Sequence, residues 1–297
     1  MKNLNILFSL ILLFAFSLSP ILAQEEDIED QEQENKPTRA HYESAWLIDN
    51  QSVVVPKKKT LEFMIQHRFG IMDNGIKDLW GLFAPSNIRL GLSYTLFDDV
   101  GFGMLKGPLA VGFGTTKDQR IQDVNLKLGM LQQTRNGKVP VSISYFGNIA
   151  METFNVQEDL PNGNSSDRYS YFHQLIISRK FSSKLSLQLA PSVSHFNVVN
   201  PLINNDHVAL AAGGRYKITA QSSVIFNADQ PITKHEYYNP QPNLSFGIEV
   251  ATSAHSFQVF VTNYSSLIPQ YNNVLNQNDP YGDGWLIGFN INRLWNF

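Results

Sequence analysis

The sequence predicts an all-β protein, a single antiparallel transmembrane up-and-down β-barrel of about twelve strands. Three observations predict this fold. Long segments alternate between apolar and polar residues, which gives each strand two chemically different faces. The chain opens with an export signal, and no later stretch is apolar and long enough to cross a bilayer as a helix. Short and long connections alternate, as they do in outer-membrane barrels.

The export signal covers residues 1–23. Lys2 supplies a positive start, an apolar run extends from Ile6 to Leu18, and Ala23 is a small residue at which a signal peptidase could cut. The chain has no cysteine, so it has no disulfides, no cysteine-based metal site and no lipid attachment point of a bacterial lipoprotein. We therefore expect an exported protein located in the cell outer membrane and surrounded by its lipid.

Residues 24–59 are expected to form an acidic, disordered leader followed by a periplasmic or plug segment. Glu25 to Glu34 contains seven acidic residues and no basic one, and such a block repels itself. The rest of the mature chain is close to neutral, which argues against nucleic acid as a partner. Further on, "AHYESAWLIDNQSVVV" contains an apolar triplet, Trp46 to Ile48, that favours burial and could fold inside the barrel.

The barrel itself is expected over residues 60–297. In "NIRLGLSYTLF", Ile88, Leu90 and Leu92 share one face, whereas Arg89 and Ser93 share the other. Many such segments reach ten or more residues, about the length that a tilted strand needs to cross a bilayer. The expected strands are 60–70, 87–97, 108–116, 120–133, 139–153, 168–181, 184–197, 206–218, 221–230, 242–252, 255–264 and 284–297.

The connections predict the orientation of the barrel, with short turns in the periplasm and long loops outside. The short links are 135–138, 182–183, 219–220 and 253–254, and the long ones are 71–86, 154–167, 198–205, 231–241 and 265–283. Two links break the rule. Residues 117–119 form a short loop, and "DDVGFGMLKGP" at 98–108 is expected to form a long turn.

The inward parity of the strands collects charged residues, and any function of the lumen would depend on them. A charge inside a barrel must be hydrated or paired. A barrel of about eight strands is filled by side chains and one of sixteen or more leaves a channel, so twelve strands leave both states open. The expected lumen-facing charges are Glu62, Arg68, Arg89, Lys127, Lys180, Arg215, Lys217, Asp229 and Glu249.

The C-terminus keeps its alternation to the last residue. Trp285 lies near one end of the final strand and Trp295 near the other, which suits two interfacial aromatic girdles. The stretch resembles the terminal signature of outer-membrane proteins, which the barrel-assembly machinery reads, although Arg293 departs from it. The residues that match are Phe289, Ile291, Trp295 and Phe297.

From about His41 to Phe297 the chain resembles an uncharacterised outer-membrane β-barrel family that is common in Bacteroidota, known as domain of unknown function 5777. The resemblance implies a barrel in the outer membrane and no catalytic residues. This chain departs from the family at "DDVGFGMLKGP", where the family has a tight turn. The series of segments that carries the resemblance is "ESAWLIDNQSV", "LEFMIQHRFG", "NIRLGLSYTLFDD", "LIISRKF", "LSLQLAPSV", "GGRYKIT", "HSFQVFVTN" and "GWLIGFNINR".

The histidines do not form a metal-binding pattern. His67, His173 and His195 fall on the lipid-facing parity, and His235 and His255 lie in or beside links. We therefore expect no metal site and no cofactor. The dipeptide Ser194–His195 and the stretch "TKHEYY" are the only indications of a hydrolase, so we assign no catalytic residue and expect no enzyme.

Three functions remain open from the sequence. The mixed, slightly basic lumen favours a narrow pore for small hydrophilic solutes. Alternatively, the protein is a structural or interaction barrel that presents loops 71–86, 154–167 and 265–283 to an outer-membrane protein partner. The third hypothesis is a barrel-borne hydrolase.

Overall fold

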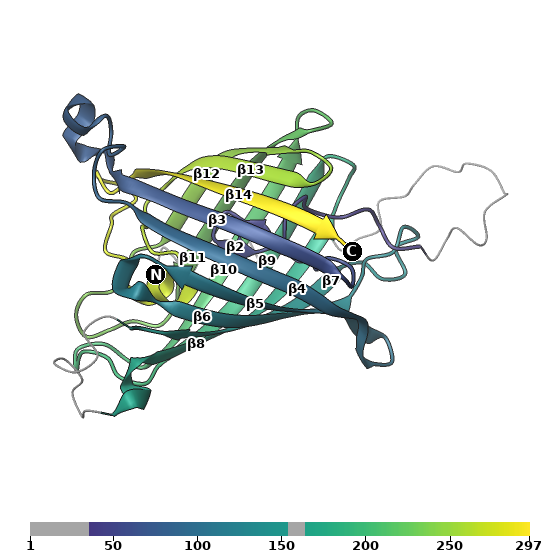
Figure 1. Cartoon of the computed structure of the whole chain (residues 1–297), viewed down its shortest axis with the longest axis horizontal. Helices are drawn as coiled ribbons and strands as arrows, with labels where there is room; N and C mark the ends of the chain where they lie inside the picture. Colours follow the sequence, from purple (N-terminus) through teal and green to yellow (C-terminus); the bar gives the residue numbers. More distant parts are fainter. Residues whose placement is uncertain (1–35, 154–163) are drawn as a thin grey trace.

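The computed structural model describes residues 36–153 and 164–297. Its body is a closed barrel of twelve antiparallel strands, in which each strand pairs with its neighbours in sequence and the last strand, β14, pairs with the first, β3 (Figure 1). The predicted fold class and strand number are confirmed. The strands are β3 (Thr60–Ile71), β4 (Asn87–Phe102), β5 (Leu105–Thr116), β6 (Gln122–Leu131), β7 (Ser142–Met151), β8 (Tyr169–Lys180), β9 (Leu185–Phe196), β10 (Asp206–Lys217), β11 (Ser222–Pro231), β12 (Asn243–Ala251), β13 (His255–Thr262) and β14 (Leu286–Asn296).

The alternation in sequence becomes an alternation of environment. Along β3, Glu62, Met64 and Gln66 are buried in the barrel, whereas the residues between them are half-exposed. The outer surface carries apolar side chains on every side, for example Leu90 at 43% and Val259 at 60% exposure. Exposed apolar side chains on this scale indicate a surface that meets hydrocarbon and not water.

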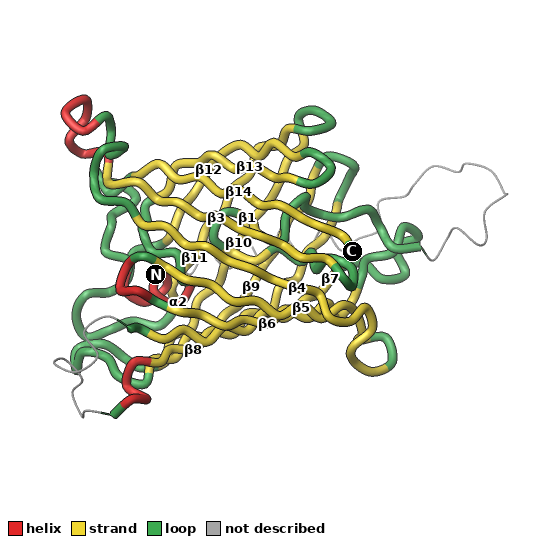
Figure 2. Tube along the Cα trace, in the orientation of Figure 1, coloured by secondary structure: helices red, strands yellow, loops and turns green. Residues whose placement is uncertain are grey.

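The two ends of the barrel differ, and we call them the turn end and the loop end. The turn end holds the C-terminus and mostly short hairpin connections, such as 181–184 and 218–221 (Figure 2). The loop end holds the longer connections and, in the described part of the chain, four short helices. These are η1 (Met72–Asp78), η2 (Asp118–Arg120), η3 (Ser165–Arg168) and α2 (Pro269–Leu275).

The expected long turn at 98–108 is wrong. β4 continues to Phe102 and β5 begins at Leu105, so only Gly103 and Met104 connect them. Register shifts at Thr95/Phe97 and Phe97/Val100 mark bulges that let the long hairpin bend away from the barrel. Gly103 has φ 59°, a left-handed conformation that glycine adopts without steric cost. The turn is therefore tight, and the extra residues lengthen its two arms.

Residues 36–59 precede the first barrel strand in sequence, and part of this segment folds into the barrel interior. Two short strands, β1 (Trp46–Leu47) and β2 (Asn50–Gln51), form a hairpin whose residues are all buried. The predicted signal peptide, the acidic stretch 25–34 and most of the predicted loop 154–167 lie outside the described residues. Within the described ranges, no helix is long and apolar enough to cross a membrane.

Candidate functional site

The interior of the barrel is the candidate site, because the predicted charges lie there. Seven of the nine are less than 7% exposed: Glu62, Arg68, Arg89, Lys127, Arg215, Asp229 and Glu249. The other two lie at the turn end, where they are half-buried. There Lys180 donates to the Ala40 carbonyl at 3.0 Å and Lys217 to the Glu43 carboxylate at 3.1 Å.

The N-terminal segment enters the barrel from the turn end. Pro37 bridges to Thr134 in the β6–β7 connection, and the Thr38 amide donates to the Gln133 carbonyl at 2.8 Å. Further in, the His41 ring contacts the Ser178 hydroxyl at 2.8 Å. Burial, and secondarily the nearby cations Lys180 and Arg215, lower the pKa of His41 to about 4, so the ring is neutral at neutral pH.

We call residues 41–53 the plug, since they fill the middle of the lumen. Their backbone is held by side chains of the barrel wall. Gln258 donates to the Trp46 carbonyl at 3.0 Å, Asn290 to the Ile48 carbonyl at 2.7 Å and Gln188 to the Gln51 carbonyl at 2.9 Å. These donors come from β13, β14 and β9. The plug is therefore bonded to opposite sides of the barrel.

The tip of the plug is strained. Ile48 has φ 60°, a conformation that a β-branched residue adopts at a cost of roughly 1–3 kcal/mol. Its amide donates to the Gln258 side chain at 3.2 Å, and its side chain is completely buried. Contacts with the wall therefore impose the turn that presents Asp49 and Asn50.

Asp49 and Asn50 carry the main polar contacts of the tip. Asp49 forms an ion pair with Arg68 of β3, and both side chains are at most 6% exposed. Asn50 donates to Asn227 at 2.9 Å and to the carboxylate of Asp229, and it accepts from Gln174 at 2.8 Å. Two of the predicted lumen charges thus have partners that the strand pattern alone does not supply.

Apolar side chains of the plug also pack against apolar side chains of the barrel wall. Phe146 and Phe172 make an edge-to-face contact with ring centroids 6.2 Å apart, and Trp46 packs on Phe146 at 6.3 Å. The lumen is therefore partly an ordinary hydrophobic core. Its buried members are Tyr42, Leu47, Ile48 and Val53 of the plug with Phe146, Phe172, Ile176, Ala190, Ala211, Ile225 and Phe260 of the wall.

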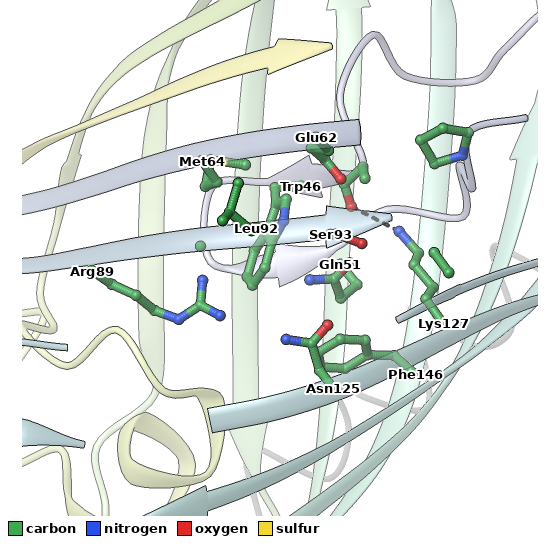
Figure 3. A pocket seen from close by; sticks show the side chains of 14 residues that line it. Trp46, Gln51, Glu62, Met64, Arg89, Leu92, Ser93, Asn125, Lys127 and Phe146 are labelled. Carbon is green, nitrogen blue, oxygen red and sulfur yellow. Dashed lines mark hydrogen bonds between the residues drawn. The ribbon is translucent and has the colours of Figure 1, made fainter. Parts of the chain in front are cut away.

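A small pocket remains beside the plug, between β3, β4 and β6. Glu62, Arg89 and Lys127 line it together with Trp46, as Figure 3 shows. Lys127 donates to the Ala45 carbonyl at 2.9 Å, the bond dashed in Figure 3. The volume of this cavity is about 20 Å³, enough for roughly one water molecule.

Two ion pairs that sequence reasoning missed stabilise the arrangement. Arg89 makes a bidentate pair with Asp123, with distances of 2.8 and 2.7 Å. Asp123 shares its parity with Lys127 on β6, so the period-two pattern could have identified it. Glu43 lies 3.1 Å from Arg215, and no pattern in the sequence connects the two. Burial raises the pKa of Glu43, but Arg215 and Lys217 outweigh burial and hold it below its usual value.

The loop end has its own inward element, which the sequence predicted only as a loop. Helix α2 folds into the mouth of the barrel, and residues Gln270 to Val274 are buried (Figure 2). Gln270 donates to Asn148 of β7 at 3.1 Å and to Ser170 of β8 at 3.2 Å. Asn272 reaches Asp49 at 3.3 Å. The helix and the plug therefore meet inside the lumen.

The residues considered for other chemistry are separated. Ser194 is 1% exposed and faces the interior, whereas His195 lies on the outer face and contacts Asp206 at 2.7 Å. His235, in "TKHEYY", contacts the Val274 carbonyl and stacks edge-on against His207, with ring centroids 4.5 Å apart. Over residues 36–153 and 164–297, no group of three or more histidine, aspartate or glutamate side chains is arranged to hold a metal ion.

The predicted C-terminal signal lies on the outer face of the closing strand. Phe289 stacks on His67 of β3 at 4.9 Å, and Arg293 lies over the Trp295 ring at 4.7 Å. Phe297 is 75% exposed, and its amide donates to the Lys59 carbonyl at 3.1 Å. The role of these residues in assembly stays a prediction.

Comparison with solved structures finds other barrels of this kind. A KdgM porin has 8% identity and a TM-score of 0.46, with 80% of this chain and 99% of that one covered. An outer membrane channel from Pseudomonas putida has 8% identity and a TM-score of 0.49, covering 91% and 100%. Outer membrane phospholipase A from Escherichia coli has 9% identity and a TM-score of 0.41, covering 79% and 91%. The similarity is confined to the barrel architecture.

Comparison with curated proteins gives no match. A family model described as a membrane-bound β-barrel domain, DUF5777, matches residues 42–295. The match includes the plug except His41, and all twelve strands except the last residue of β14. The chain belongs to this family of membrane-bound β-barrels.

Proposed function

We propose that this protein is a narrow outer-membrane pore for small hydrophilic solutes that its own N-terminal plug holds closed. The observation that supports it is that the segment filling the lumen is not part of the barrel wall. The lumen is blocked by residues 41–53, which belong to no barrel strand and are joined to β3 only through residues 54–59. Withdrawal of the plug toward the turn end would free this part of the lumen without breaking a single strand pair.

The wall that the plug covers suits water. Gln174, Gln188, Gln258 and Asn290 all point inward and bond to the plug, and each could bond to water instead. A barrel with a purely structural role has no need of amides at these positions, because an apolar filling packs as well. The polar wall therefore favours an interior that is hydrated in one of its states.

A direct test uses the absence of native cysteine. The Asn292 amide donates to the Ser44 hydroxyl at 3.0 Å, so Ser44→Cys with Asn292→Cys allows a short thiol cross-linker to fasten the plug to β14. Asp49→Ala with Asn50→Ala removes the polar contacts of the tip. In planar bilayers we expect this tip variant to open far more often than the wild type. Cross-linking in the same background should abolish the openings, and single-cysteine variants serve as controls.

The outcomes separate the pore from the gate. A tip variant that folds, as its heat-modifiable gel band shows, but never conducts would contradict the pore. A wild-type barrel that conducts steadily whether or not the plug is cross-linked would contradict closure by the plug.

A second candidate function has one specific observation in its favour. The η1 loop projects from the loop end and exposes Ile76 at 71%, Trp80 at 48% and Phe83 at 78% (Figure 1). Apolar side chains grouped on one projecting loop suit contact with another outer-membrane protein. Recovery of a stoichiometric partner in mild detergent, lost when all three residues are changed to serine, would favour an interaction barrel.

A further inference from the structure

The loop end contains a second pocket, which no residue of the plug lines. It lies between α2 with the residues that follow it and the rim formed by the ends of β4, β5 and the η2 turn. Its volume is about 270 Å³, just below the roughly 300–1,000 Å³ that is typical of ligand pockets. A pocket of this size suits a small solute.

Amide side chains dominate the wall of this pocket. They are Asn87, Gln119, Asn272, Asn276, Gln277 and Asn278. An amide offers both donors and acceptors, so it matches the hydroxyl group, which also does both. Leu275, which is 41% exposed, adds apolar surface on which the carbon face of a ring can lie.

The charges of the lining residues argue against both anionic and cationic ligands. Among the described residues that line the pocket, Asp118 is the single charged one, and no lysine or arginine contributes. The neighbouring Lys117 is directed away, donating to the Ser86 carbonyl at 2.8 Å. An anion would meet Asp118 with no cation to bind it, and one carboxylate is a weak site for a cation.

Several lining groups are held in place but keep bonding capacity. The Asn272 amide donates to the Ser266 carbonyl at 3.0 Å, and the Asn276 amide donates to Asn243 at 2.9 Å. The Thr116 hydroxyl is buried and has no hydrogen-bond partner among the described residues. Buried polar atoms are normally paired, so a missing partner calls for an explanation. A bound hydroxyl group at this position would supply it.

The backbone of the η2 turn is also unusual. Gln119 has φ 51°, a left-handed conformation that non-glycine residues rarely adopt. Strained conformations of this kind gather at ligand-binding positions. The strain places Gln119 on the rim of the pocket, opposite α2.

From these observations we infer that the loop-end pocket binds a small uncharged solute rich in hydroxyl groups, of the class of the neutral monosaccharides. The amides and the Thr116 hydroxyl hydrogen-bond its hydroxyls, and Leu275 contacts its carbon face. Binding does not require the barrel to conduct, so the inference stands or falls independently of the pore.

The experiment measures saturable binding of glucose, galactose and N-acetylglucosamine to the folded barrel by saturation-transfer NMR. The detergent is an amine oxide, because glucoside and maltoside detergents carry the same chemistry as the probes. Gluconate and glucosamine, similar in size but charged, are the comparison ligands. We expect at least one neutral sugar to bind, with each charged analogue at least about tenfold weaker, a difference that corresponds to about 1.4 kcal/mol.

Two variants locate the site. Gln119→Ala and Thr116→Val should each weaken binding about tenfold, whereas Gln221→Ala, an exposed glutamine at the turn end, should leave it unchanged. Three results would overturn the inference: no saturable binding of any of the three neutral sugars to the folded wild type, charged analogues that bind as well as the sugars, or binding that both pocket variants leave intact.

Discussion

At the scale of single residues, the lumen is organised by charges that lie on different parts of the chain. Arg68 of the wall is completely buried, and Asp49 of the plug is its anionic partner. An arginine enclosed without a carboxylate would be strongly unfavourable, since burying a charge costs several kcal/mol. The wall and the plug therefore depend on each other through a pair that neither provides alone.

This dependence gives the first prediction. Among the described residues, Asp49→Ala leaves the His67 carbonyl and the Asn290 amide oxygen as the acceptors of Arg68. Losing one partner of a buried pair costs roughly 3–5 kcal/mol. In this variant, release of the plug lets water reach Arg68, which reduces the cost of the unpaired charge. We therefore expect faster backbone hydrogen exchange over residues 44–52 with the barrel strands unchanged.

The control for this variant is Asp99→Ala. Asp99 is exposed and lies 4.0 Å from Lys106 in the projecting β4–β5 hairpin, so its loss should not change exchange in the plug. Unaltered protection of residues 44–52 in Asp49→Ala would mean that the pair does not hold the plug.

A second residue-scale prediction compares the two faces of β4. Leu90 is 43% exposed on the outer surface, and arginine there should destabilise the barrel by roughly 2–4 kcal/mol if the position lies at mid-bilayer. Ser93 lines the pocket beside Glu62 and Lys127, where an arginine could pair with Glu62, so Ser93→Arg should cost clearly less. Urea unfolding in phospholipid vesicles measures both. Equal costs would show that β4 has no lipid face.

At the scale of elements, closure of the barrel depends on the pairing of β14 with β3. Trp295 is opposite Leu61, and Asn296 is opposite Thr60, so the pairing continues to the end of the strand. An unpaired strand edge in lipid would leave backbone groups without partners at several kcal/mol each. The end of the chain is thus part of the seam that closes the barrel.

The third prediction concerns Phe297. Deleting it, or changing it to aspartate, should sharply lower the amount of assembled barrel without lowering synthesis. Deletion removes the backbone bond to Lys59, and both changes remove an aromatic anchor at the expected interface. The heat-modifiable gel band measures folded barrel. The matched control is Phe102→Asp, because Phe102 is 93% exposed at the tip of the β4–β5 hairpin.

Asn296→Ala is a weaker control for this experiment, since the Thr60 hydroxyl donates to Asn296 at 2.9 Å and its loss should cost about 1 kcal/mol. If the Phe297 deletion assembles as well as wild type, the terminal aromatic is not an assembly signal.

Elements that alternate were predictable, and elements defined by tertiary contact were not. β8 and β9 begin and end within one residue of the expected bounds, because lipid and lumen select opposite side chains at every step. Helix α2 has seven residues and no apolar periodicity, and it exists through contacts with β7 and β8. The plug was considered for its apolar triplet, but several of its partners, such as Gln174 and Gln258, come from strands more than a hundred residues away.

At the scale of the whole molecule, the two elements that fold into the lumen enter from opposite ends of the barrel. The plug enters from the turn end and α2 from the loop end, and they meet at Asp49 and Asn272. A change in one can therefore alter the contacts of the other. Because each end faces a different compartment, the orientation of the barrel decides which compartment can act on the plug.

The fourth prediction fixes this orientation. Lys77 in η1 and Lys138 in the β6–β7 connection are both exposed, at opposite ends of the barrel. The chain has no native cysteine, so Lys77→Cys and Lys138→Cys each provide a single thiol. Strands inserted from the periplasm leave short turns and termini on that side. A membrane-impermeant maleimide should then label Lys77→Cys on intact cells, and Lys138→Cys only after the outer membrane is broken.

The same samples test location. Both variants should fractionate with the outer membrane and resist carbonate extraction, because the apolar outer belt needs lipid. Labelling of Lys138→Cys alone on intact cells would show the opposite orientation, with the turn end, from which the plug enters, outside the cell. Recovery of folded protein in the soluble periplasm would exclude a membrane location altogether. With the expected labelling, the plug faces the periplasm and the amide-lined pocket faces the medium, so a solute arriving from outside meets the pocket before it meets the plug.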